Sequence, residues 1–235
     1  MGEFVVRYYL HSSLVDYSKM ELHNEYHWVE DLVKHVHFPC HVLLVASSPD
    51  DIEKTRHYAQ EIVDVMDKHG LCLSGFDILD RSSAKRIKEL IDKADIIIAM
   101  GGHVPTQNTF FHEIDLKKHL QDFNGVWIGS SAGSMNSATL VYAQPELEGE
   151  VIDPTYKRFV RGLGLTKKII LPHYSSWKND VVDGFRLLED VTYPDSRGYV
   201  FYLMEDGSYV LGDTEEKIEE VVGEYYILHD GVMIQ

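Results

Sequence analysis

The stretch NGVWIGSSAGSMNSA, residues 124–138, carries the most information about the fold of this chain. An apolar run, 126–128, leads into Gly129-Ser130-Ser131-Ala132-Gly133, which fits the pattern G-x-S-x-G in one register only, with Ser131 at its centre. A strand, a sharp turn and a helix in this order are typical of a nucleophile elbow, in which flanking glycines let the strand and helix approach closely. The alternative interpretation is a tight strand-to-helix turn that is merely rich in serine.

Strand and helix patterns alternate on both sides of this stretch. Continuous apolar runs indicate strands buried on both faces, and apolar residues at helical spacing indicate the helices between them. The predicted strands are 4–10, 41–47, 71–79, 95–102 and 125–130, and the predicted helices are 24–36, 48–70, 82–94, 109–123 and one that begins at 132 and runs through 142. Ser48 or Asp50 is expected to cap the second helix. The alternation predicts an α/β fold, a three-layer sandwich with a mostly parallel central sheet and helices on both faces.

The pattern becomes irregular after residue 143 and then resumes. Residues 143–164 are predicted to form a loop region, 167–174 a strand and 175–191 a helix. Residues 199–213 are expected to form a strand, an acidic turn and another strand, and 218–235 to end in a hairpin that turns at His229-Asp230-Gly231. Since no repeat or linker divides the chain, residues 1–235 are predicted to form a single domain.

Composition restricts the partners and the compartment. The formal net charge is −16 and no basic cluster stands out, so neither nucleic acid nor an anionic membrane surface is expected as a partner. The two cysteines, Cys40 and Cys72, form no CxxC pair, which favours a reducing compartment. Because the sequence shows no signal peptide and no apolar run of about 18 residues, the protein is predicted to be cytoplasmic.

A diglycine ends the predicted strand that precedes residues 125–130. Ligands of open α/β sheets bind at the carboxyl ends of the strands, so Gly101 and Gly102 are expected to lie beside Ser131. The backbone N–H of Ala132 and the N–H groups of the diglycine are the predicted oxyanion donors. His103, which follows directly, is expected to contact the substrate.

A serine nucleophile requires a base and a carboxylate that orients it. Of the thirteen histidines, His173 is favoured because it follows the predicted strand in IILPHY and therefore faces the same edge of the sheet. The carboxylate is less clearly marked. The candidates are Glu205, which ends a later strand, its neighbour Asp206, and a group of acids after the predicted elbow helix, namely Glu146, Glu148, Glu150 and Asp153.

Other chemistry finds little support. The histidines at 23, 27, 35, 37 and 41 lack metal-site spacing, and the sequence has no HExxH, GxGxxG or Walker A pattern. We therefore expect neither a metal nor a cofactor.

Four segments together carry a resemblance to a known family. The set MGG…NTFF, GSSAGS, LPHY and LMEDGSY, spread between about residues 40 and 213, resembles the serine peptidase family of peptidase E (aspartyl dipeptidase) and cyanophycinase. These enzymes are similar to class I glutamine amidotransferases, which implies that fold here. The resemblance implies Ser131 as nucleophile, His173 as base, Glu205 as the orienting carboxylate and Gly102 and Ala132 as oxyanion donors. It also implies Gly101, His103 and Asn108 as substrate-binding residues.

Two departures from the family pattern concern the substrate. His103 stands where the family has a third glycine, or Asn or Asp, and residues 175–190 contain only Lys178 and Arg186 where peptidase E is rich in arginine. Side-chain specificity therefore stays open. The expected function is a serine hydrolase that cleaves a short peptide or isopeptide-like amide. The alternatives are a non-catalytic binding protein on the same scaffold and an esterase or amidase for a non-peptide substrate, and a homodimer also stays open.

Overall fold

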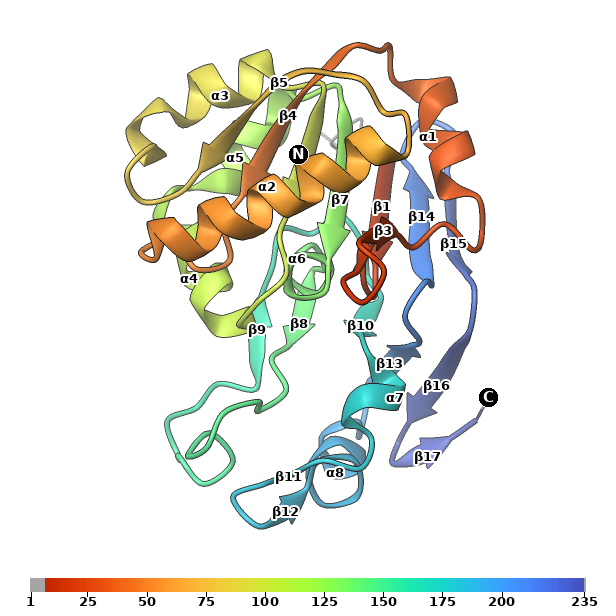
Figure 1. Cartoon of the computed structure of the whole chain (residues 1–235). Coiled ribbons are helices and arrows are strands. Elements are labelled where there is room, and N and C mark those ends of the chain that lie inside the picture. The colour runs from red at the N-terminus through yellow and green to blue at the C-terminus, as the bar shows by residue number, and fades with distance from the viewer. Residues whose placement is uncertain (1–6, 235) are drawn as a thin grey trace.

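The computed structural model describes residues 7–234, and its centre is a seven-stranded sheet (Figure 1). Five strands, in the order β1-β7-β6-β4-β5, are mutually parallel, and β14 and β15 extend the sheet beyond β1 in antiparallel pairing. Their bounds are β1 Arg7–His11, β4 Cys40–Val45, β5 Leu73–Leu79, β6 Ile96–Ala99, β7 Val126–Ser130, β14 Tyr209–Asp213 and β15 Ile218–Val222. The predicted α/β class with a mostly parallel sheet is confirmed; residues 4–6 of the first predicted strand lie outside the described part of the chain.

Helices cover the two faces of this sheet because alternate strand residues point to opposite sides. Tyr9, Leu44 and Ile98 belong to a core that includes residues of α1 and α2, whereas their neighbours Tyr8, Leu43 and Ile97 belong to a core with α3, α4 and α5. Figure 1 shows α2 crossing the front of the sheet. The helices are α1 Trp28–His35, α2 Ile52–Lys68, α3 Ile87–Lys93, α4 Val104–Glu113 and α5 Leu116–His119, with 3₁₀ turns at Ala84–Arg86 and Leu120–Asp122. Asp51, rather than Ser48 or Asp50, caps α2 by accepting a hydrogen bond from the Lys54 N–H.

A second, four-stranded sheet lies below the carboxyl ends of the central strands in Figure 1. Its order is β10-β13-β16-β17, with β10 Ile169–Leu171 parallel to β13 Val200–Met204, and β16 Tyr225–His229 and β17 Val232–Met233 forming the predicted hairpin through Asp230-Gly231. Three small pairs complete the strands: β2 Val15–Asp16 with β3 Glu21–Leu22, β8 Leu140–Tyr142 with β9 Phe159–Arg161, and β11 Val181–Val182 with β12 Phe185–Arg186. A third apolar core, which includes Tyr142, Trp177 and Phe201, joins this sheet to α6 Ala132–Asn136.

Two of the predicted helices are broken or shortened in the structure. The helix expected at 109–123 begins earlier, at Val104, because Pro105 fits the first helical turn, where its missing N–H is not needed. It breaks at Asp115, whose φ is 48°, into α4 and α5. The helix expected through residue 142 ends at Asn136, because the β-branched and aromatic run at 140–142 pairs with β9 instead.

The largest error falls on residues 175–191. Only Tyr174–Trp177 forms an α-helix, α7, and it is followed by the β11–β12 hairpin and a π-helical turn at Leu187–Thr192 that leads into α8 Tyr193–Asp195. Asp183 and Gly184 both have positive φ, 53° and 83°, which is the geometry of a two-residue hairpin turn. The dipeptide Asp-Gly between apolar residues was the signal for this hairpin.

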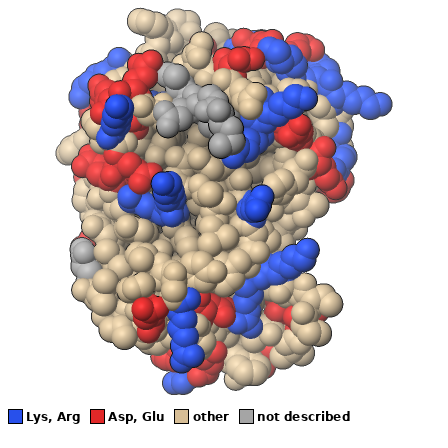
Figure 2. All heavy atoms as spheres, turned by 180° about the vertical axis from the view of Figure 1, so that it is seen from behind, with Lys and Arg blue, Asp and Glu red and all other residues tan. Residues whose placement is uncertain are grey.

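The described residues contain no helix long and apolar enough to cross a membrane. On the face turned away from the viewer of Figure 1, lysine and arginine side chains are interspersed with aspartate and glutamate and are separated by uncharged surface (Figure 2). The residues that the structure describes on that face therefore form no continuous basic patch.

Candidate active site

Ser131 occupies a strained turn between β7 and α6. Its backbone has φ 50° and ψ −113°, a conformation that non-glycine residues rarely adopt. The turn is held from below by the His11 carbonyl, which accepts hydrogen bonds from the Ser131 N–H at 3.1 Å and the Ser134 hydroxyl at 2.6 Å. The geometry is that of the elbow predicted from the sequence.

Gly129 and Gly133, the two glycines of the G-x-S-x-G pattern, lie where helix α6 comes very close to the strands. A Cβ at Gly129 would lie 2.8 Å from the backbone nitrogen of Ser134, and a Cβ at Gly133 would overlap the carbonyl oxygen of Ala99 on the neighbouring strand. Helix α6 can pack directly on β7 and β6 only because these side chains are absent. The strained serine is therefore supported by contacts that larger residues would prevent.

His173 is brought to Ser131 from the second sheet. It follows β10 and has φ 58° at the start of α7, which turns its ring toward the end of the central sheet. His173 Nε2 lies 2.9 Å from Ser131 Oγ. This juxtaposition agrees with the sequence-based pairing of the two residues.

The carboxylate on the other side of the His173 ring is Asp206 and not Glu205. Asp206 Oδ1 lies 2.6 Å from His173 Nδ1, whereas Glu205 accepts hydrogen bonds from the Ser175 hydroxyl at 2.7 Å and the Ser175 N–H at 3.2 Å. The expectation that Glu205 lies within hydrogen-bond reach of His173 is wrong. Strand β13 ends at Met204, and Glu205 begins a turn closed by the Ser208 N–H, so the alternation of a continuing strand does not apply to Asp206.

Hydrogen bonds keep Asp206 ionised. Burial by itself would raise its pKa, but the hydrogen bond and charge of His173 and the hydrogen bond from Ser12 outweigh it, and the net effect lowers the pKa of Asp206. Since an ionised carboxylate only accepts hydrogen bonds, Nδ1 of His173 carries the proton and Nε2 is free to accept from the Ser131 hydroxyl.

Ser12 is a site residue that the sequence reasoning missed. Its buried hydroxyl accepts from the His173 N–H at 2.8 Å and donates to Asp206 Oδ1 at 2.8 Å, and its own N–H bonds to the Ser208 carbonyl at 2.9 Å. Ser12 thereby fastens the two loops of the second sheet to the end of β1. The signal was available, because Ser12 and Ser13 directly follow a strand that runs parallel to β7.

The predicted oxyanion donors are placed beside the serine. Ala132 is the first residue of α6, so its N–H has no acceptor within the helix. A Cβ on Gly101 would lie 3.3 Å from Ser131 Cβ, and Gly102 lines the same cavities as Ser131. Gly102 has φ 152° and packs so closely on Ser47 that a Cβ would overlap that side chain. The diglycine and the elbow are thus neighbours, as parallel β6 and β7 require.

Two predicted substrate-binding residues are engaged elsewhere. The Asn108 amide is buried and donates to Asn136 Oδ1 and to the Arg161 carbonyl, both at 2.9 Å, which fixes α4 to α6 and β9. His103 bonds through Nδ1 to Thr106 at 2.7 Å and through Nε2 to Glu150 at 2.8 Å. The side chains of both residues are therefore engaged in contacts that hold α4 to its neighbouring segments.

Two cavities meet at Ser131, and Gly102, Ser131 and His173 line both. One, of about 280 Å³, lies between the β1–β2 loop and the start of α2. The other, of about 410 Å³, lies between α7 and the segment that follows β8. These sizes lie near the lower end of the range for small-molecule sites. The serine can therefore meet a substrate that extends a short way into each cavity.

His11, directly behind the elbow, is a buried histidine in an aromatic cage. Its ring centroid lies 4.6 Å from that of Trp28 and 5.1 Å from that of Tyr209, and among the described residues neither ring nitrogen has a hydrogen-bond partner. Burial, with a smaller contribution from His23, lowers the pKa of His11 to about 3. The ring is therefore neutral in the folded protein.

We expect His11 to make the protein less stable in mild acid. The unfolded chain binds a proton at His11 near pH 6.5 and the folded chain does not until about pH 3, so stability is lost as pH falls below about 6.5. The free energy of unfolding is expected to be about 2 kcal/mol lower at pH 5 than at pH 7.5. Urea unfolding at both pH values should show that His11→Phe, or His11→Leu if packing rejects the larger ring, loses about 2 kcal/mol less than the parent protein. Equal losses in parent and variant would contradict this expectation.

A strained serine between a parallel strand and a helix, bonded to a histidine that is in turn bonded to a carboxylate, is the arrangement of α/β serine hydrolases. The sequence profile of Peptidase family S51 matches residues 31–216, and the chain belongs to this family. This membership supports a peptidase-type hydrolase. A search of curated proteins found no significant match.

Solved structures share the fold. A peptidase from an acI-B1 Actinobacterium superposes with a TM-score of 0.64 at 18% identity, covering 98% of this chain and 93% of that one. A putative peptidase E protein from Listeria monocytogenes EGD-e gives a TM-score of 0.61 at 16% identity, covering 93% of this chain and 99% of that one. The predicted resemblance to peptidase E-like proteins is confirmed at the level of family and fold.

Proposed function

We propose that this protein is a serine peptidase that cleaves a short peptide or a similar small amide with a Ser131–His173–Asp206 triad. The observation that carries the proposal is the continuous chain of contacts, 2.9 Å from Ser131 Oγ to His173 Nε2 and 2.6 Å from His173 Nδ1 to Asp206 Oδ1. Two small cavities meeting at the serine favour a short substrate over a folded protein.

The proposed reaction follows from these positions. Ser131 Oγ attacks the substrate carbonyl while its proton passes to His173 Nε2, and Asp206 stabilises the imidazolium that forms. The N–H groups of Ala132 and Gly102 bind the oxyanion. His173 then gives its proton to the leaving amine, and a water molecule activated by the same histidine hydrolyses the acyl-enzyme to release the acid and restore Ser131.

A serine-reactive fluorophosphonate probe tests the assignment without knowledge of the substrate. The intact protein should become labelled at Ser131, as located by peptide mass spectrometry, and Ser131→Ala should not. A panel of dipeptides with varied first residues, run beside simple esters, then separates a peptidase from an esterase. Absence of labelling and of hydrolysis by the folded protein would indicate a non-catalytic binding protein.

Replacing Asp206 distinguishes it from its neighbour. Asp206→Asn should lower kcat by about 10³- to 10⁴-fold, because an amide favours the wrong His173 tautomer and does not stabilise the imidazolium. Glu205→Gln is the matched control, since Glu205 bonds to Ser175, and it should lower kcat by less than about 10-fold. Steady-state kinetics with the best substrate of the panel measures both. A larger loss from Glu205→Gln than from Asp206→Asn would reverse the assignment.

A further inference from the structure

The two cavities that meet at Ser131 carry opposite charge. We call the cavity beside α7 the acidic pocket and define it by Gln144, Glu146, Trp177 and Asp180. We call the cavity beside α2 the basic pocket and define it by Ser48, Lys54, Thr55 and Tyr58. Among the described residues that line them, the acidic pocket has two carboxylates and no lysine or arginine, and the basic pocket has Lys54 and no carboxylate.

The carboxylates of the acidic pocket are not engaged by cations of the protein. Among the described residues, neither the Glu146 nor the Asp180 side chain forms an ion pair. Both residues are exposed to solvent and line the pocket. A carboxylate that has no cationic partner in the protein gains when a positive group of the substrate binds beside it.

The segment that holds Glu146 is fastened in place. Glu150 accepts hydrogen bonds from the backbone N–H groups of Glu146 and Leu147 at 2.8 and 3.0 Å, and its other oxygen lies 2.8 Å from His103 Nε2. Asp183 on the β11–β12 turn accepts from the N–H groups of Gly149 and Val151 at 2.7 and 3.0 Å. His103 thus acts on this pocket indirectly, because it holds the segment that carries Glu146. A segment that is already held in place loses less conformational freedom when a ligand binds.

Asp180 is held on the opposite wall. Its N–H bonds to the Trp177 carbonyl at 2.8 Å and its carbonyl accepts from the Leu187 N–H at 2.9 Å, while the Trp177 ring donates to the Pro172 carbonyl at 2.7 Å. The indole and the Asp180 side chain line the same cavity. An apolar wall next to a negative charge suits an ammonium or guanidinium group on an aliphatic stem.

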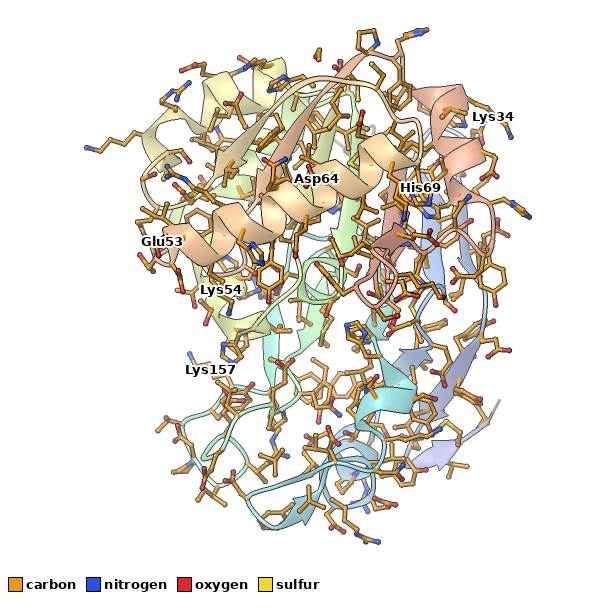
Figure 3. All side chains as sticks on the ribbon, in the orientation of Figure 1. Lys34, Glu53, Lys54, Asp64, His69 and Lys157 are labelled. Atoms are coloured by element: carbon orange, nitrogen blue, oxygen red, sulfur yellow. The ribbon has the colours of Figure 1, made fainter. Side chains whose placement is uncertain are left out.

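Lys54 projects from the first turn of α2 toward the loops below it (Figure 3). Glu53, labelled beside it, belongs to the same turn but does not line the basic pocket. The Lys54 ammonium forms no ion pair within residues 7–234 and is therefore available to an anionic group.

We propose that charge sets the orientation and selectivity of the substrate, with a positively charged nitrogen in the acidic pocket and a carboxylate directed to Lys54 in the basic pocket. This inference rests on the proposed function, since it places the scissile carbonyl at Ser131 between the two charges. A short peptide with free termini has this polarity, and a lysine or arginine side chain supplies the same positive group. A substrate side chain that is acidic, as in an aspartyl peptide, is repelled from the acidic pocket by Glu146 and Asp180.

Matched dipeptides test the charge requirement. The first residue is lysine, norleucine or glutamate, each with a free or an acetylated N-terminus, and the second is leucine as the free acid or the amide. We measure kcat/KM with the intact chain and Kd with Ser131→Ala by calorimetry. A substrate with a positive group on the acyl side should be preferred at least about 10-fold over its neutral counterpart, and glutamate should be the poorest side chain. Loss of binding on acetylation identifies the α-ammonium as the bound cation, and a preference for lysine over norleucine that survives acetylation identifies the side chain.

Variants that remove one charge at a time show which side chains cause the charge preference. Glu146→Gln and Asp180→Asn should each reduce the preference for the cation about 3- to 10-fold through KM and Kd, and the double variant should nearly abolish it. Glu148→Gln, an acid of the same segment that does not line the pocket, is the matched control. Lys54→Met should remove the preference for the free carboxylate over the amide, and Lys34→Met, on α1 at a distance in Figure 3, should not.

The outcomes separate this inference from the proposed function. Labelling of Ser131 and hydrolysis without any charge preference would overturn the inference and leave the peptidase standing. Charge-selective binding by Ser131→Ala without labelling or hydrolysis by the parent would support the inference and overturn the peptidase. A preference that is unchanged in the Glu146→Gln/Asp180→Asn double variant, or absence of binding by every peptide, would also overturn it.

Discussion

Ser131→Ala is expected to lower kcat by about 10⁵-fold or more while the protein stays folded, as for other serine nucleophiles. The reason is that Oγ is the atom placed 2.9 Å from His173 Nε2, and alanine keeps the Cβ and the backbone geometry but removes the attacking oxygen. Steady-state kinetics on the best dipeptide, with circular dichroism and the thermal midpoint as checks of folding, measures the effect.

Ser130→Ala is the matched control for the nucleophile. The Ser130 hydroxyl accepts a hydrogen bond from the Leu14 N–H at 3.2 Å, so its loss should weaken packing near the pocket and cost less than about 10-fold in kcat. Equal losses from the two variants, or full activity of Ser131→Ala, would refute Ser131 as the nucleophile.

His173→Ala is expected to have an effect of similar size, at least about 10³-fold in kcat and up to the loss seen for Ser131→Ala. Without the imidazole, the Ser131 proton has no acceptor at 2.9 Å and the leaving amine has no donor. Since the members of a triad act as one unit, the double variant Ser131→Ala/His173→Ala should be little worse than either single variant. His69→Ala, at the far end of α2 from Lys54 in Figure 3, is the control and should retain activity.

Losses that multiply in the double variant would indicate that His173 supports packing rather than proton transfer. The pH profile gives a second readout. Hydrogen bonds lower the pKa of Asp206, so its ionisation should not limit kcat/KM at any pH near neutrality, and a limb of the profile in that range should belong to another group.

Local patterns in the sequence were enough for the central sheet and for the serine–histidine pair. Apolar runs such as 41–47 and 95–102 mark strands buried on both faces, and the order strand, G-x-S-x-G, helix places Ser131 at a carboxyl edge. Parallel strands end at one edge, so the neighbourhood of Gly101 and Ser131 follows from the pattern alone. His173 could be found in the same way, as a side chain that directly follows a strand.

Contacts between distant segments decided which carboxylate bonds to His173. These contacts depend on where a turn begins and not on the periodicity of the sequence. In the parallel register of β10 and β13, Leu171 lies opposite Leu203, and continuing that register would place Glu205 opposite His173. The turn that begins at Glu205 instead directs Asp206 to His173, with Ser12 from the end of β1 holding both. The length of β13 and the meeting of two sheets are set by tertiary packing, which a single strand's sequence does not encode.

The same distinction holds for the substrate pockets. Lys54, Glu146 and Asp180 are three among the many charged residues of the sequence, separated by long stretches of chain. Only the fold sets them around Ser131, through the start of α2, the segment after β8 and the loop after α7. The sequence by itself determined the elbow and the sheet that supports it, because both follow from patterns among neighbouring residues. The choice of carboxylate and the charge of the pockets were decided by the packing of the second sheet and its loops against the carboxyl edge of the central sheet.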